Sequence, residues 1–143
     1  MGSAKVTANS ASQPLVAVVN QLNSGAKKGA SYGGFDPAAG TAKVSMPLVM
    51  ARNSSWYTGV TVQNVGSSST AVTLMYSDGS GPYTQTIAAG ASWVVDQNSH
   101  FGGTFVGSAT FEAGTGGKII AVCNELNPTL PGDAFLVYEG FNY

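Results

Sequence analysis

The residues that could perform acid–base or nucleophilic chemistry are few in this chain. There is one histidine, His100, in the Gly- and Ser-rich stretch QNSHFGG, and one cysteine, Cys123, in the apolar stretch IIAVCNEL. A catalytic or metal-bound histidine needs polar partners, and a reactive thiolate needs an accessible, electropositive setting. No Cys or acidic cluster lies beside His100, and the stretch IIAVCNEL does not suggest an electropositive, accessible setting for Cys123. We therefore expect His100 in a solvated loop and Cys123 as a small buried hydrophobic residue.

The acidic residues also fail to suggest a catalytic centre. Most fall in turns or at predicted strand ends, and none forms the close pair used in glycoside hydrolysis: Asp36, Asp78, Asp96, Glu112, Glu125, Asp133 and Glu139. The stretch SDGSG loosely resembles a calcium loop but lacks the regular oxygen ligands and the closing Glu. We expect no catalytic residue, no bound metal and no cofactor, so the sequence does not predict an enzyme.

A Lys–Asn isopeptide crosslink is one specialised structure that the sequence would allow. Lys5, Lys43 and Lys118 lie in or beside predicted strands, and Asn20 and Asn124 lie on apolar strand faces, as an isopeptide crosslink would require. The simpler interpretation is that each Lys points to solvent and each Asn bonds backbone groups.

The aromatic residues allow a similar choice. They could form a platform on which sugar rings stack, but strand alternation would bury at least some of them, and the sequence favours core positions: Trp56, Tyr57, Tyr76, Tyr83 and Trp93.

Charge and hydropathy exclude some partners. The chain of 143 residues has 9% charged residues and a net charge of -1, which gives no long-range field to attract nucleic acid or an anionic membrane. The apolar runs PLVAVV and KIIAVC have the length of strands, far below the roughly 20 residues of a membrane-spanning helix. We expect neither nucleic-acid binding nor a membrane span.

The hydrophobic periodicity is that of strands. In WYTGVTVQN, Val60 and Val62 share one face while Thr61 and Gln63 share the other, and TAVTLMY alternates similarly. Clusters of turn-forming residues follow both stretches. No segment has a convincing helical period. The predicted strands are 4–8, 15–22, 31–35, 42–45, 48–51, 56–64, 70–76, 83–87, 92–96, 105–113, 118–126 and 134–141, which together indicate an antiparallel sandwich.

One segment of the sequence occurs twice. GSAKVTANSASQPLVAVVNQLN (2–23) aligns with GSATFEAGTGGKIIAVCNELN (107–127), and YGGF (32–35) aligns with YEGF (138–141). The offset runs 105, 104 and 106, so the length changes fall in loops. Such self-similarity is typical of tandem arrays. The chain is thus predicted to hold one complete repeat preceded by the tail of another, and to be a segment of a longer polypeptide.

The duplicated strand is apolar on both faces for most of its length. One face carries Leu15, Ala17, Val19 and Gln21 in the first copy and Ile119, Ala121, Cys123 and Glu125 in the second. The other face carries Val16, Val18, Asn20 and Leu22, matched by Ile120, Val122, Asn124 and Leu126. A strand with one solvated face should alternate, so we expect something to cover this second face and predict a strand-pairing or repeat interface there. A loop such as 23–30, the other hairpin, or a neighbouring repeat could each cover it.

These residues resemble a known group of sequences. The run GSA…VTA…QPLVAVVNQ…YGGF, followed by MPLVMARNSSWYTGVTVQNVGSSSTAVTLMYSDGSG and IAAGAS, resembles the repeats of long, low-charge secreted or surface proteins of bacteria. Those repeats are in turn similar to bacterial cell-adhesion-related domains with an immunoglobulin-like sandwich. The resemblance implies an all-β, antiparallel, immunoglobulin-like β-sandwich and an extracellular or cell-surface location. It supplies no catalytic or ligand-binding residues.

The first copy is too short to fold alone, so it needs a partner surface. We expect residues 1–40 to form a hairpin plus linker that packs on the complete repeat (41–143) or on a neighbouring molecule, as an added strand does. The predicted function is that of a structural or adhesive repeat, with neighbouring repeats or copies of itself as partners. The alternative is a module that binds carbohydrates or another surface ligand, with surface glycans as partners.

Overall fold

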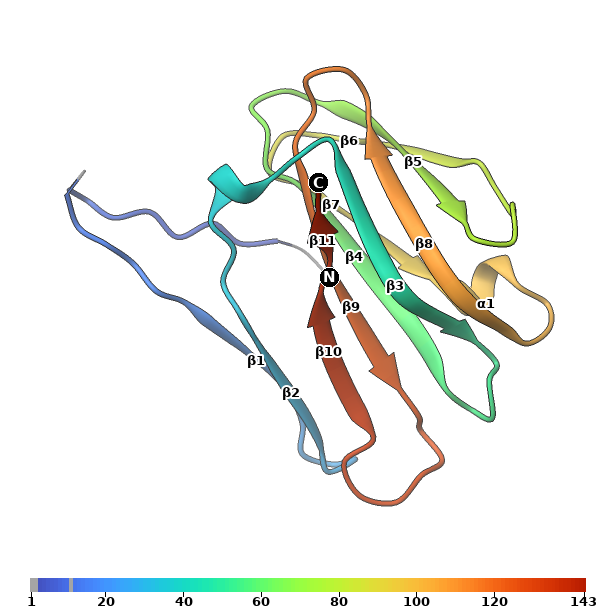
Figure 1. Ribbon diagram of the computed structural model, residues 1–143. Helices are drawn as coiled ribbons and strands as arrows, with labels where there is room; N and C mark the ends of the chain where they lie inside the picture. Colours follow the sequence, from blue (N-terminus) through green and yellow to red (C-terminus); the bar gives the residue numbers. More distant parts are fainter. Residues whose placement is uncertain (1–2, 11) are drawn as a thin grey trace.

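Two antiparallel sheets pack face to face, and a separate two-stranded hairpin lies at one side of them (Figure 1). The computed structural model describes residues 3–10 and 12–143. Gly2, where the predicted duplication begins, lies outside the described residues. The protein is therefore all-β with a sandwich of sheets, as the sequence predicts.

The smaller sheet of the sandwich has the order β10-β9-β4-β7, and the larger has the order β11-β3-β8-β5-β6. The first contains β4 (Tyr57–Asn64), β7 (Ser92–Asp96), β9 (Ile119–Leu126) and β10 (Phe135–Glu139). The second contains β3 (Lys43–Ala51), β5 (Thr70–Tyr76), β6 (Tyr83–Ile87), β8 (Phe105–Ala113) and β11 (Phe141–Asn142). The separate hairpin consists of β1 (Val18–Asn23) and β2 (Lys28–Gly33).

Strand alternation builds the core between the two sheets. Every second residue of β4 and of β5 is buried, which confirms the alternation predicted for both strands. Across the interface, the ring of Phe111 on β8 meets that of Trp93 on β7 at 5.9 Å and 85°. Edge-to-face aromatic pairs of this kind add to the stabilisation that burial provides.

The β3 strand is continuous, whereas the sequence predicts two strands, 42–45 and 48–51. Its pairing with β8 shifts register between Met46 and Val49. Pro47, which lacks an N–H group, lies at this irregularity and is exposed. The proline therefore bends one strand instead of ending it.

The predicted strand 134–141 is divided into β10 and β11, because the chain moves from one sheet to the other at Gly140. A Cβ atom on this residue would overlap side-chain atoms of Val44 and Met46. Only glycine can pass this close to β3 without displacing core side chains.

The N-terminal part departs most from the prediction. Residues 4–8 form no strand, although the matching residues 109–113 do so within β8. The β8 strand pairs on both edges, with β3 and β5, and no described segment pairs with 4–8. Strand β1 likewise starts at Val18 instead of Leu15, and β2 spans 28–33 instead of 31–35.

Two short helical turns occur where no helix is predicted. They are η1 (Pro37–Ala39) and α1 (Gln97–His100). Each is capped at its start by an aspartate, because Asp36 and Asp96 accept a hydrogen bond from the backbone N–H two residues later. Turns this short depend on their caps and leave no hydrophobic period in the sequence.

Candidate functional site: the duplicated hairpin

The β1–β2 hairpin has the same strand register as the β9–β10 hairpin. The pairs of the first run from Val18 with Gly33 to Asn23 with Lys28. Adding 104 to the first residue and 106 to the second turns Val18–Gly33 into Val122–Glu139, a pair of the second hairpin. All five pairs of the second hairpin are related in this way. The sequence duplication is thus also a duplication of structure.

The equivalence extends to the end of each hairpin. Gly34 donates its N–H to Ala17 O at 2.7 Å, and Gly140 donates its N–H to Ala121 O at 2.8 Å. These four residues match under the same offsets. Tyr32 corresponds in turn to Tyr138. Both hairpins therefore close on the same backbone contact.

The second hairpin is built into the sandwich. Along its whole length β9 pairs with β4, from Tyr57 with Leu126 to Asn64 with Ile119. Tyr138 donates its hydroxyl hydrogen to Leu48 O at the bend of β3. Both faces of β9 are largely buried, as the sequence predicts for a strand that is apolar on both faces.

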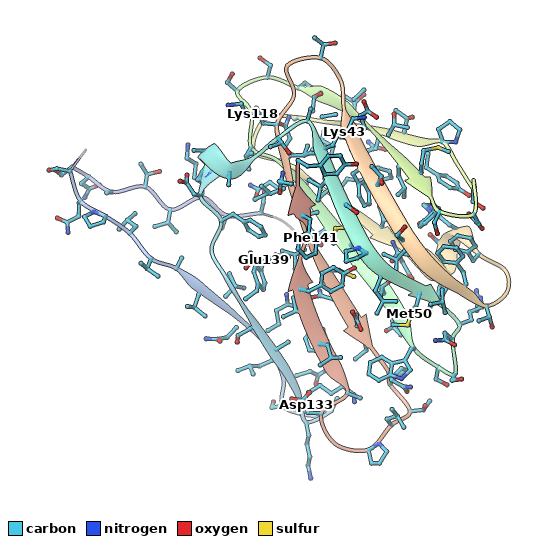
Figure 2. All side chains as sticks on the ribbon, viewed as in Figure 1. Lys43, Met50, Lys118, Asp133, Glu139 and Phe141 are labelled. Carbon is cyan, nitrogen blue, oxygen red and sulfur yellow. The ribbon has the colours of Figure 1, made fainter. Side chains whose placement is uncertain are left out.

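The first hairpin lacks these partners. In the part of the chain that the structure describes, β1 pairs only with β2, so its other edge has no strand beside it. Its apolar side chains remain accessible: Val16 is 96% exposed, Val18 65% and Leu22 81%. Figure 1 shows β1 as the outer strand of the hairpin, with β2 between it and β10, and Figure 2 gives the side chains in the same view.

The first hairpin touches the sandwich mainly through its tip and through β2, which lies beside β10 (Figure 1). Lys28 is buried, and its Nζ donates to Leu130 O and Gly132 O at 3.4 and 3.1 Å. Gly29 donates its N–H to Asp133 Oδ1 at 3.1 Å. Polar contacts with the loop between β9 and β10 thus hold one end of the hairpin.

The eight residues predicted for the interface separate into two environments. Those of the first copy are exposed: Val16, Val18, Asn20 and Leu22. Those of the second are buried or partly buried: Ile120, Val122, Asn124 and Leu126. The Asn124 side-chain oxygen is buried and has no hydrogen-bond partner among the described residues.

His100 does not lie in a solvated loop, so that prediction is wrong. The α1 turn carries it back over β5 and β6, where its ring stacks on Tyr83 with centroids 4.0 Å apart. The side chain is partly buried, and burial lowers its pKa while Asp96 opposes the shift. Its neighbours are phenols and phenyl rings, which suit packing.

Cys123 is fully buried, as predicted, and burial raises its pKa to about 12, against a hydrogen bond with Tyr138. Burial likewise raises the pKa of Glu125 on the same face of β9. The thiol is therefore held in its protonated, unreactive form. Sequence reasoning did not identify Glu125 as a buried carboxylate, since it ends an otherwise ordinary strand.

In the described part of the chain, the remaining charged candidates do not gather at one site. Lys43 forms an ion pair with Glu112 at 3.2 Å, and Lys5 and Lys118 are exposed. Asp78 accepts hydrogen bonds from the N–H and hydroxyl of Ser80, so its carboxylate orders a turn. Among residues 3–10 and 12–143, no group of three or more His, Cys, Asp or Glu side chains could hold a metal ion.

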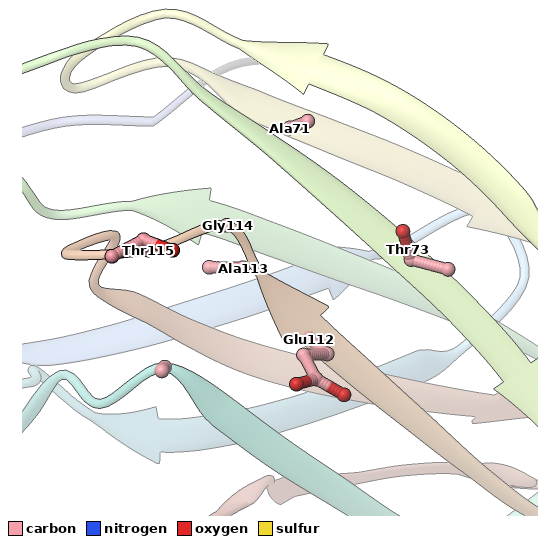
Figure 3. A pocket seen from close by; sticks show the side chains of 7 residues that line it. Ala71, Thr73, Glu112, Ala113, Gly114 and Thr115 are labelled. Atoms are coloured by element: carbon pink, nitrogen blue, oxygen red, sulfur yellow. The ribbon is translucent and has the colours of Figure 1, made fainter.

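A shallow hollow of about 520 Å³ lies on the outer surface of the larger sheet (Figure 3). Small side chains and one carboxylate line it: Ala42, Ala71, Thr73, Glu112, Ala113, Gly114 and Thr115. Glu112 is paired with Lys43, and the other lining residues are Ala, Gly and Thr, so the lining holds no unpaired ionisable side chain.

Comparison with known proteins gives no further guide to the site. No family model, curated protein or solved structure matches this chain.

No helix in the described part of the chain is long and apolar enough to cross a membrane. The duplicated hairpin is therefore the candidate functional site of this chain.

Proposed function

We propose that this protein is a non-catalytic structural repeat of an extracellular or cell-surface protein, which joins neighbouring repeats or copies by strand pairing and apolar packing. The observation that carries the proposal is the first hairpin. It copies β9–β10 pair by pair but leaves one edge of β1 unpaired and its apolar side chains exposed.

The energetic argument follows from burial. A Val or Leu side chain contributes about 1.5–3 kcal/mol when it moves from water into a core. Val16, Val18 and Leu22 are 65–96% exposed, so most of that stabilisation is unused in the single chain. A strand with an unpaired edge and apolar side chains is a template for pairing with another chain.

The test is the molar mass in solution, by size exclusion with light scattering over a wide range of concentration. We expect the full chain to form oligomers whose mass rises with concentration. Val16→Lys with Leu22→Lys should keep the chain monomeric, because a charged side chain is costly to bury in an apolar contact. The change should cost the single chain little stability, since both residues are exposed. A chain lacking residues 1–35 should also stay monomeric.

Val106→Lys is the matched control, because Val106 is 53% exposed on β8, away from the hairpin. It should assemble like the unmodified chain. A full chain that is monomeric at every concentration would contradict the proposal.

A further inference from the structure

The two hairpins differ in surroundings but match in register, which raises the question of whether they are interchangeable. We propose that β1–β2 is an alternative occupant of the place that β9–β10 fills, so that the sandwich can be closed by the hairpin before it or by the hairpin after it. This inference rests on the proposed function, since it names the site to which the repeat's spare hairpin binds.

The core-facing side chains support the exchange. Ile119, Ala121 and Cys123 are at most 1% exposed on the core face of β9. Their equivalents in β1 are Leu15, Ala17 and Val19, which are apolar and of similar size. Substitutions that conserve volume are the ones cores tolerate best.

One position of β1 fits this place better than the present occupant does. Glu125 is 8% exposed, and burial opposes its ionisation. Its equivalent is Gln21, which keeps the shape without a charge. A buried charge without a close partner is costly, so the exchange removes an unfavourable group from the sandwich.

The strand that follows the hairpin also matches. Gly140 is required where the chain passes Val44 and Met46, and Gly34 supplies glycine at the equivalent point. Tyr32 offers the phenol that Tyr138 directs to Leu48 O. The match ends at Asp36, which cannot donate the hydrogen bonds that its equivalent, Asn142, gives to other groups.

The chain connection allows the exchange within one molecule. Tyr143, at the end of β11, donates its N–H to Lys43 O at the start of β3. Its equivalent in the first copy is Pro37, which has no N–H to repeat this bond. From this position, the five residues 38–42 would join the exchanged strand to β3. Hairpin loops of this length are common. The exchange would release β9–β10 and expose Cys123.

Lysine substitutions at two equivalent alanines test the proposal. Ala17 is exposed in the structure and Ala121 is buried, so Ala17→Lys blocks only the exchanged form and Ala121→Lys blocks only the observed form. We expect Ala121→Lys to keep a cooperative thermal melt, because β1–β2 takes over, and its Cys123 to react rapidly with a thiol reagent. The double variant should lose the melt, because a lysine would then be buried in either form.

Labelling of Cys123 under native conditions gives an independent readout. We expect Ala17→Lys to melt like the unmodified chain but to slow this labelling by about tenfold or more, which corresponds to ~1.4 kcal/mol in the exchange equilibrium. Equal loss of folding in Ala121→Lys and in the double variant would overturn the proposal. So would a folded Ala121→Lys with Cys123 protected, or unchanged labelling in Ala17→Lys. A monomeric unmodified chain would count against assembly but would leave these differences intact.

Discussion

The hydroxyl of Tyr76 and Nδ1 of His100 are hydrogen-bonded at 2.8 Å, which fastens the α1 turn to the end of β5. Tyr76 is 4% exposed, and burial raises its pKa above the ordinary value, so the phenol stays protonated. Its ring also meets Phe105 edge-on at 5.5 Å. The sandwich is thus closed at this end by aromatic packing around this hydrogen bond.

We expect Tyr76→Phe to lower the free energy of unfolding by about 0.5–1.5 kcal/mol, because it removes this hydrogen bond and keeps the ring. Urea denaturation at pH 7.5 measures the change. The matched control is Tyr57→Phe, on the partly buried start of β4, which should change stability less. Equal effects in the two variants would show that the Tyr76–His100 contact is not special.

The contribution of His100 to stability should fall as the pH is lowered below about 6.5. Burial lowers the pKa of His100 below that ordinary value, so the folded state binds the proton less tightly than the unfolded state. The stabilisation is complete above pH 6.5 and is lost as the pH falls through the lowered pKa. His100→Phe keeps an aromatic ring against Tyr83. It should reduce the change in melting temperature between pH 7 and pH 5. An unchanged slope would contradict this account.

Glu125 should act in the opposite direction. Burial raises its pKa above the ordinary 4.5, so its contribution to stability is complete below pH 4.5 and is lost as the pH rises through the raised pKa. Near it on the core side are Cys123 and Tyr138. We expect Glu125→Gln to raise the melting temperature at pH 7 and to have less effect at pH 4. Glu139→Gln, at an exposed position, is the control and should change neither value.

Thr58 and Gln97 form a buried polar contact that should be costly to break. The Thr58 hydroxyl lies 3.0 Å from Gln97 Oε1 and accepts from Met50 N–H at 2.9 Å. Thr58→Val would leave these buried groups without a partner, at a cost of about 1–3 kcal/mol. Thr61→Val, on the opposite face of β4, should stay within about 0.5 kcal/mol. Urea denaturation measures the free energy of unfolding of both variants. An equal loss in Thr58→Val and Thr61→Val would show that the effect comes from strand propensity and not from the buried contact.

Much of the fold follows from local pattern. Strands 70–76, 83–87, 92–96 and 105–113 were predicted with the bounds they have, because alternation and turn residues are properties of neighbouring positions. The burial predicted for Cys123 is confirmed, since a single thiol in an apolar strand packs as a small hydrophobic residue. The sequence also predicts the duplication, with the offsets of 104 and 106 residues that relate the two hairpins in the structure.

Tertiary structure alone decided the environment of each copy. Residues 4–8 and 109–113 are equivalent in the duplication, yet only the second copy forms a strand, because β3 and β5 pair with it. Val18 and Val122 are equivalent, yet one is 65% and the other 8% exposed. The prediction that His100 lies in a solvated loop is wrong for the same reason, since the α1 turn brings it against Tyr76 and Tyr83, which are far away in the chain. The sequence by itself determined which segments can become strands. Which of them found partners depended on contacts between distant residues, which local patterns do not encode.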